Sequence, residues 1–291
     1  MTAFHVTEIW RYPVKSMQGE RLDACVVTKT GIPLDRGWAV RDESQKTIRG
    51  AKYIPDLLNC SARYLEGTSA GLVPHVEIAL PDGSKVRSDE PCVHDALSAA
   101  LGVAVTLWPL QPEGDADHFV ARTPSGVRKI DDLRRVFGLE PGDPLPDFSR
   151  FPPSILAELT QYATPRGTYF DAYPIDVLTQ ASLRYLQAFI PSSRLDIRRF
   201  RPNFLIADDG EMRALAEEAW VGSEIWLGEA RLSVAVAAVR CIMTTRAQMD
   251  LPQDSAVMKA LIRETRHCLS VYANVVTPGM VRTGDALTSE S

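Results

Sequence analysis

The sequence predicts a mainly β protein with a few helices (α+β), organised as β-barrel-like domains. Short runs rich in Val, Ile, Thr and aromatic residues, bounded by Gly, Pro and Asp, recur in both halves, and such runs predict strands. Helical patterns are few and do not alternate one for one with the strands, which argues against a parallel doubly wound sheet. The length of 291 residues suits two domains of about 150 residues each.

Residues 1–112 are predicted to form the first barrel-like domain. The strand-like runs are FHVTEIW, DACVVT, GWAV and HVEIAL. The pair Asp82-Gly83 between VEIAL and KVRS predicts a hairpin, because both residue types tolerate positive φ. Apolar residues recur at helical spacing over 93–101, and Gly102 is a stop signal. A short amphipathic helix is therefore expected there.

Residues 113–168 are predicted to be a connection with little regular structure, because the stretch is rich in Pro, Gly and Asp. The second domain, 169–291, is expected to start with a helix behind Thr179, whose hydroxyl can cap ASLRYLQAFI. Another helix is predicted over AVMKALIRETRH, because Pro252 and Asp254 just upstream are helix-start signals. The remaining runs, read as strands, are NFLIA, SEIWLG, RLSVAVAAV, SVYANVV and MVRTGDAL.

Composition excludes several classes of protein. The formal net charge of -5 and the pI near 5.6 argue against a nucleic-acid partner. Four arginines crowd the stretch RLDIRRFR and suit a small anion, although a solvated face is the commoner use of such a run; they are Arg194, Arg198, Arg199 and Arg201. No signal-peptide pattern and no apolar run of 18 residues occurs, so we expect a cytoplasmic protein without a membrane partner.

The five cysteines point to a reducing compartment, because they are odd in number, widely spaced and free of C-x-x-C pairs. Cys241 is the cysteine that we consider a candidate site residue, since RCIMTT follows the apolar run LSVAVAAV directly and so stands at a predicted strand end. The neighbouring Arg240 should favour the thiolate, which is the form that binds metals or attacks as a nucleophile. A small buried hydrophobic residue is the alternative and the commoner role of an isolated cysteine. The residues alone leave both open.

Six motifs together resemble the MOSC family (molybdenum cofactor sulfurase C-terminal domain-like) in order and spacing. The resemblance is closest to the two-domain branch that includes the mitochondrial amidoxime-reducing components and their bacterial relatives. It implies an N-terminal MOSC-associated β-barrel domain and a C-terminal MOSC β-barrel with a few packed helices, with the molybdenum cofactor bound between them. The motifs are YPVKS (12–16), LDRGW (34–38), DAYPIDVLTQASL (171–183), RFRPN (199–203), RCIMTT (240–245) and VYANVVTPGMVRTGD (271–285).

The resemblance also implies site residues. Cys241 corresponds to the protein ligand of molybdenum and so to the catalytic centre, and a soft thiolate matches the dithiolene sulfurs of the cofactor. Asp35 is expected to orient an arginine. The segment TTRAQMDLPQDS after the cysteine departs from the family pattern, and we expect its residues Arg246, Gln248 and Asp250 to lie over the metal. The cofactor-contact positions are Lys15, Ser16, Arg36, Arg201 and Arg240, with Asn203, Thr179 and Ser182 as further contributors.

The function implied is that of a molybdenum-dependent oxidoreductase. It would reduce N-hydroxylated substrates, namely amidoximes, hydroxylamines and N-hydroxylated bases, by removing oxygen at molybdenum in a Mo-molybdopterin cofactor. The sequence carries no Fe–S, haem or flavin motif, so we expect a separate electron donor of the ferredoxin, flavin reductase or cytochrome type.

Two alternatives remain. The chain could carry molybdenum cofactor, or sulfur as a persulfide on Cys241, without turnover of its own, or it could keep only the fold without a cofactor. A pyridoxal-phosphate-dependent sulfurase reaction is not expected, since 291 residues leave no room for the domain that performs it.

Overall fold

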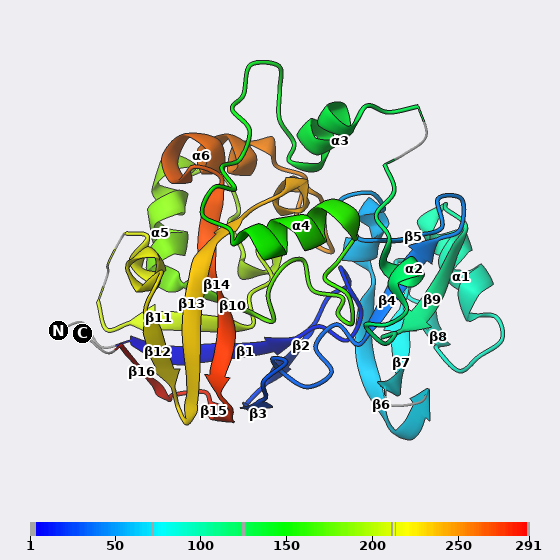
Figure 1. Cartoon of the computed structure of the whole chain (residues 1–291), viewed down its shortest axis with the longest axis horizontal. Coiled ribbons are helices and arrows are strands. Elements are labelled where there is room, and N and C mark those ends of the chain that lie inside the picture. Colours follow the sequence, from blue (N-terminus) through cyan, green and yellow to red (C-terminus); the bar gives the residue numbers. More distant parts are fainter. Residues whose placement is uncertain (1–3, 71–72, 124–125, 211, 213, 290–291) are drawn as a thin grey trace.

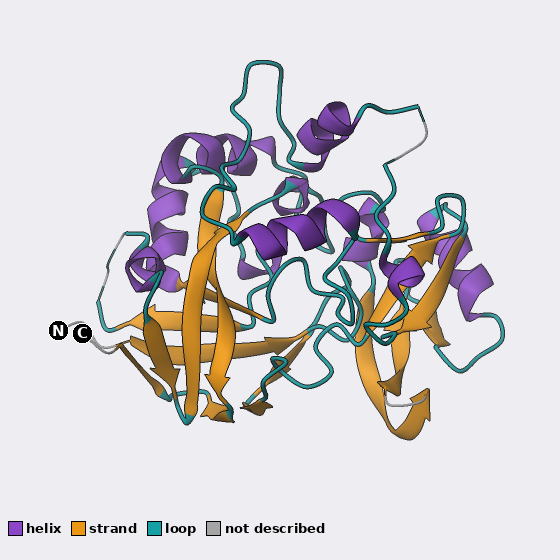
Figure 2. Cartoon of the chain, in the orientation of Figure 1, coloured by secondary structure: helices purple, strands orange, loops and turns teal. Residues whose placement is uncertain are grey.

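The computed structural model describes residues 4–70, 73–123, 126–210, 212 and 214–289. Two strand-rich parts lie side by side, and a segment of loops and short helices crosses from one to the other (Figures 1 and 2). The expected α+β class is confirmed.

The larger part is a closed barrel of seven strands in the order β11-β10-β14-β13-β12-β16-β1, closed by pairing of β1 with β11. Strands that alternate in direction around a ring cannot close with an odd number, so at least one pair must be parallel. Among the described strands of the ring that pair is β10–β11. The strands are β1 (Phe4–Arg11), β10 (Ile175–Thr179), β11 (Phe204–Asp208), β12 (Glu224–Leu227), β13 (Ala230–Val239), β14 (Cys268–Thr277) and β16 (Ala286–Ser289).

The sequence pattern explains the barrel interior. Along β13, buried and partly exposed residues alternate without interruption, as the two-residue period of a strand requires when one face meets the core. β2 (Glu20–Leu22) extends the sheet beside β1, and β3 (Ala24–Val27) pairs with β15 (Gly279–Arg282). β1 comes from the first 112 residues, yet it pairs with β11 and β16 of the second half.

Two helices pack on the barrel and match the sequence expectation. α5 (Gln180–Phe189) starts at Thr179, whose side chain accepts a hydrogen bond from the Ser182 amide. α6 (Ser255–Thr265) starts at Asp254, which caps it in the same way. Their apolar faces form one cluster with residues of β10, β11 and β14. Shorter 3-10 turns are η2 (Ile197–Arg199), η3 (Ala216–Trp220) and η4 (Ile242–Thr245).

The N-terminal part consists of two three-stranded antiparallel sheets around one core. The predicted hairpin is confirmed, with Gly83 at φ +86° between β7 and β8, and the predicted helix α1 ends at Gly102 with φ +65°. The sheets are β5-β4-β9 and β6-β7-β8, whose elements are β4 (Trp38–Asp42), β5 (Thr47–Arg49), η1 (Pro55–Asn59), β6 (Ser61–Ala70), β7 (Val73–Ala79), β8 (Lys85–Arg87), α1 (Val93–Leu101) and β9 (Val105–Pro109).

The connecting segment contains more helix than its composition predicts. It forms α2 (Ala116–Phe119), α3 (Lys129–Val136) and α4 (Pro153–Gln161). Prolines are compatible with the first turn of a helix, where the missing N–H has no intrahelical partner, and α4 begins at such a position. Phe119 packs with the N-terminal part, whereas Phe151 packs with β13. No helix in the described ranges is both long and apolar enough to cross a bilayer.

Candidate functional site

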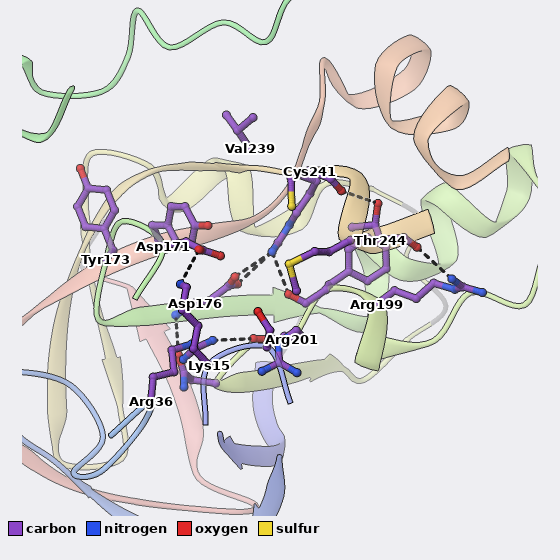
Figure 3. Close-up of a pocket in the computed structure, with 16 residues that line it drawn as sticks. Lys15, Arg36, Asp171, Tyr173, Asp176, Arg199, Arg201, Val239, Cys241 and Thr244 are labelled. Atoms are coloured by element: carbon purple, nitrogen blue, oxygen red, sulfur yellow. Dashed lines mark hydrogen bonds and ion pairs between the residues drawn. The ribbon is translucent and has the colours of Figure 1, made fainter. Parts of the chain in front are cut away.

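A narrow pocket is lined by residues from both halves of the chain (Figure 3), and its volume is about 60 Å³. Seven of the nine residues predicted for the site line it, namely Lys15, Ser16, Arg36, Arg201, Asn203, Arg240 and Cys241. Segments distant in the sequence are thus brought together. The other lining residues are Asp171, Tyr173, Asp176, Arg199, Phe200, Val239, Met243, Thr244 and Tyr272.

Cys241 lies two residues beyond the end of β13, at the position that precedes η4. Its side chain is partly exposed at the pocket and packs against the core of the N-terminal part. Burial raises the pKa of the Cys241 thiol, while the nearby Lys52 ammonium lowers it and Asp171 raises it. Arg240 also lowers the pKa of the thiol, as expected, but burial outweighs the cations, so the net pKa of Cys241 in the protein alone is raised.

Arg240 takes part in a buried network of hydrogen bonds. Its guanidinium donates to the carboxylate of Asp176 at 2.9 and 3.2 Å, to the Leu269 carbonyl at 2.7 Å and to the Phe200 carbonyl at 2.9 Å. The charge of the Arg240 guanidinium and most of its N–H groups are thus already paired within the protein, as a buried guanidinium requires. Arg240 fixes the floor of the pocket by tying together β13, β14 and β10.

Lys15, Asp171 and Lys52 form a cluster of charges at the pocket. Lys15 Nζ donates to Asp171 Oδ1 and to the Tyr169 carbonyl, both at 2.8 Å, and Lys52 Nζ lies 3.6 Å from Asp171 Oδ1. Burial opposes the charge on Asp171, but Lys15 and Lys52 hold the pKa of its carboxyl well below the usual range. The sequence reasoning did not single out Asp171 or Lys52 as site residues.

Arg36 and Arg201 lie over the Tyr12 ring, with guanidinium carbons 4.9 and 4.1 Å from its centroid. Asp35 pairs with Arg36, as expected of an orienting partner, and accepts from the Asn203 side chain at 2.9 Å. Stacking and pairing together fix both cations at the pocket.

Three predicted site residues have left-handed backbone conformations. Ser16, Arg36 and Arg201 have φ of 69°, 56° and 58°. A non-glycine residue in this region is strained, and such residues cluster at functional sites when the surrounding structure enforces them. The strain supports a functional role for this corner of the pocket.

Arg201 offers a binding group that the protein does not use. Nη1 donates to the Met17 carbonyl at 2.6 Å, but Nη2 is buried and has no hydrogen-bond partner in the described part of the chain. Burial lowers the pKa of Arg201 to about 10. An unsatisfied buried guanidinium is unfavourable, and an anion in the pocket would satisfy it.

The structure does not bring Thr179 and Ser182 to the pocket. Both hydroxyls donate to the buried carboxylate of Glu217, which also accepts from the Ser270 amide at 3.0 Å. Burial raises the pKa of Glu217. The contacts of these two residues link α5 to η3 and β14.

The segment after Cys241 contributes residues to the pocket, but not the ones that we expected. Arg246, Gln248 and Asp250 are absent from the residues that line it, and Met243 and Thr244 are present. Arg199 fastens the loop by donating to the carbonyls of Thr244, Arg246 and Pro252 at 3.0, 3.2 and 2.8 Å.

The arginine cluster is divided between two roles. Asp250 pairs with Arg194 at 2.6 Å and with Arg198 at 2.7 Å. The cluster therefore contributes Arg199 and Arg201 to the pocket, while its other two members are neutralised at the surface.

Comparisons with known proteins agree with this architecture. The MOSC N-terminal beta barrel domain model matches residues 3–108, and the MOSC domain model matches residues 164–288. Mitochondrial amidoxime reducing component 2 of Bos taurus is 26% identical over 251 residues, which cover 82% of this chain and 66% of that protein. Mitochondrial amidoxime-reducing component 1 of Mus musculus is 27% identical over 244 residues, covering 82% and 65%.

The chain thus spans slightly less than two thirds of the length of these curated relatives. Among solved structures, the YUAD protein from Bacillus subtilis aligns over 99% of this chain and 94% of its own, with 12% identity and a TM-score of 0.45. With a MOSC N-terminal beta barrel domain followed by a MOSC domain, the chain belongs to the MOSC family.

Proposed function

We propose that this protein binds a molybdenum cofactor in the pocket, with Cys241 as the protein ligand, and reduces N-hydroxylated substrates by removing their oxygen. One observation carries the proposal: the Cys241 thiol and a buried guanidinium nitrogen of Arg201, which has no hydrogen-bond partner among the described residues, line the same cationic pocket. The names of the amidoxime-reducing relatives support the reaction class.

The residues at the pocket fit the chemistry of that cofactor. A thiolate is the soft ligand that molybdenum bonded to dithiolene sulfur prefers, and metal binding favours the deprotonated thiol despite its burial. Arg201 and Arg36 are placed to hold the cofactor phosphate, with Lys15 and Ser16 beside them. Small-molecule sites span about 300 Å³ or more, so a pterin would extend beyond the enclosed 60 Å³. When bound, the cofactor supplies the metal and the electrons for oxygen removal.

The reaction consumes two electrons and two protons for each N–O bond broken and releases water. Lys52 is the cation that lowers the pKa of Cys241 most, and it lies 3.6 Å from Asp171 of the pocket. Asp171 raises the pKa of Lys52, so the ammonium keeps its proton. We assign it to stabilising negative charge on the thiolate and on the substrate oxygen, rather than to acid catalysis.

We further propose that a separate protein of the ferredoxin, flavin reductase or cytochrome type supplies the electrons, since the sequence carries no redox-cofactor motif of its own.

The experiment loads the purified chain with molybdenum cofactor, supplies reduced viologen dye and measures conversion of benzamidoxime to benzamidine by chromatography. We expect turnover by the wild type and by Lys85→Ala, a surface control, and its loss in Cys241→Ala. Absence of turnover by molybdenum-loaded wild type would contradict the proposal. A persulfide on Cys241 in metal-free protein, detected by mass spectrometry, would favour a sulfur carrier instead.

A further inference from the structure

A second and larger cavity, of about 760 Å³, lies between the N-terminal part and the connecting segment. Its walls come from residues 48–53 around the end of β5, from 121–123 and α3, and from 159–163 at the end of α4. Its volume lies in the range of sites for small organic molecules, about 300–1,000 Å³. Of its lining residues, only Lys15 also lines the narrow pocket beside Cys241, so the two are separate spaces.

The lining is strongly cationic although the protein is acidic. Only one carboxylate, that of Asp132, is among the described lining residues, and it already accepts hydrogen bonds from Tyr53 at 2.8 Å and Arg135 at 2.6 Å. The whole chain has a formal charge of -5, so this concentration of positive charge is local. Cations gathered in a hollow attract anionic ligands. The cations are Lys15, Arg49, Lys52, Arg122 and Lys129.

Apolar and aromatic surface makes up the rest of the lining. The guanidinium carbons of Arg49 and Arg135 lie 3.7 and 4.7 Å from the centroid of the Tyr53 ring. These two cations hold the ring in place. Ile130 of α3 lines the cavity and is 45% exposed, which leaves apolar surface open to a ligand. A ligand that buries such surface needs an apolar or aromatic body of its own. The remaining apolar and aromatic contributors are Ile48, Ala121, Leu133, Val136, Leu159, Tyr162 and Ala163.

The cavity borders the candidate active site. Lys15 lines both the cavity and the narrow pocket. Lys52 lines the cavity and pairs with Asp171 of the pocket. A molecule long enough to span the cavity would thus reach from α3 to these lysines, of which Lys15 also lines the pocket of Cys241.

Arg122 and Lys129 are the cations placed to meet a ligand. Lys15 and Lys52 are already paired with Asp171, and Arg49 donates to the Arg122 carbonyl at 2.6 Å. Arg122 and Lys129 are exposed residues of the connecting segment. Among the described residues, the Arg122 side chain makes only a long hydrogen bond, from Nε to the Lys46 carbonyl at 3.4 Å, so most of its guanidinium N–H groups remain for a ligand.

We propose that this cavity is the substrate-recognition site and that it selects organic anions. The substrate class is an N-hydroxylated molecule with an aromatic or aliphatic body and an anionic group remote from the N–O bond. Arg122 and Lys129 hold the anionic group, Tyr53 and Ile130 contact the body, and the N–O group lies toward Cys241. The inference rests on the proposed reductase function for the reacting end of the molecule.

Binding of non-reducible analogues tests the cavity without any turnover. Calorimetry compares 4-carbamoylbenzoate with neutral benzamide on the purified wild type and on the double variant Arg122→Ala/Lys129→Ala. We expect 4-carbamoylbenzoate to bind more tightly than benzamide. The double variant should bind 4-carbamoylbenzoate about five- to tenfold more weakly than the wild type, since each exposed charge contributes modestly. Benzamide binding should not change between the two proteins.

The matched control is Arg63→Ala/Lys85→Ala, which removes the same charge from side chains that are 60% and 61% exposed in the N-terminal hairpins. Circular dichroism verifies that both double variants fold. Equal affinity of the wild type and Arg122→Ala/Lys129→Ala for 4-carbamoylbenzoate, or an equal loss in the control, would overturn the assignment.

A kinetic comparison separates this inference from the proposed function. With molybdenum-loaded enzyme, we expect a lower KM for 4-carboxybenzamidoxime than for benzamidoxime, and loss of that preference in Arg122→Ala/Lys129→Ala. Turnover of both substrates without a preference would overturn the cavity assignment and leave the reductase function standing. Charge-dependent binding without turnover of either would count against the reductase and support the cavity.

Discussion

Lys15 Nζ and Asp171 Oδ1 lie 2.8 Å apart although 156 residues separate them in the sequence. Lys15 belongs to the N-terminal part, and Asp171 belongs to the segment that leads into β10. The Lys15 side chain is only 7% exposed, and removing one partner of a buried ion pair leaves the other charge uncompensated. This contact therefore fastens the two parts of the molecule at the place where we locate the active site.

Asp171→Asn should destabilise the protein. Burial already lowers the pKa of Lys15, and Asp171 is the main influence that opposes this shift. The loss should be about 2 kcal/mol in the free energy of unfolding, less than for a fully buried pair because Asp171 is 44% exposed. Denaturant titration followed by fluorescence measures it.

Asp131→Asn is the matched control, because Asp131 pairs with Arg128 at the surface of α3. Exposed pairs of this kind contribute about 0.5 kcal/mol or less. If Asp171→Asn were as stable as Asp131→Asn, the Lys15–Asp171 pair would not be a fastening contact.

Gly50→Ala should disturb the site by crowding it. A methyl group at Gly50 would lie 2.7 Å from Ser16 Oγ and 3.5 Å from Lys15 Cε. The Ser16 hydroxyl accepts a hydrogen bond from the Ala51 amide at 3.0 Å, so moving it breaks that bond. We expect a loss of about 1–2 kcal/mol in stability together with lower molybdenum retention. Gly114→Ala, which meets open space, should leave both unchanged.

His118 should make stability depend on pH. It is buried in the connecting segment, and its Nε2 lies 2.8 Å from the Tyr169 hydroxyl. Burial lowers the pKa of His118 below its ordinary value of 6.5, so the unfolded chain binds the proton more readily. The His118 contribution to stability is present above about pH 6.5 and is lost as the pH falls through the folded-state pKa.

The measurement compares the unfolding free energies of wild type and His118→Phe between pH 7.5 and 5, a range of about one unit or more on either side of the ordinary pKa. The wild type should lose stability relative to the variant as the pH falls. A constant difference across this range would show that His118 does not titrate as described.

Local signals in the sequence predicted the helices and turns of the fold well. Gly83, Gly102, Thr179 and Asp254 occupy the turn and cap positions that their residue types indicated. These features depend on a few neighbouring residues, which is why they can be read without the structure. The short helices of 113–168 were not predicted, because tertiary contacts such as those of Phe119 and Phe151 stabilise a segment whose composition disfavours helix.

Strand partners and site electrostatics depend on distant residues and could not be predicted in the same way. The pattern of β1 shows a half-buried strand but not that β11 and β16 are its neighbours. The resemblance to the family motifs predicted that Lys15, Arg201 and Cys241 share one site, and all three line the same pocket. No local pattern showed that Asp171 would pair with Lys15.

The geometry also shows the limit of motifs for assigning roles. Thr179 and Ser182 lie in a motif that resembles the family, yet their hydroxyls meet Glu217 rather than the pocket. The unused nitrogen of Arg201 appears only once the surrounding acceptors are placed.

The central claim, that the Cys241 sulfur holds molybdenum, is tested most directly by elemental analysis of purified protein. Wild type, Cys241→Ala and Cys92→Ala are produced in cells that make the cofactor; Cys92 is exposed and away from the pocket. Cys241→Ala should fold with a stability loss of about 1 kcal/mol, yet lose its molybdenum, while wild type and Cys92→Ala retain it equally. Folded Cys241→Ala with as much molybdenum as the wild type would contradict the account.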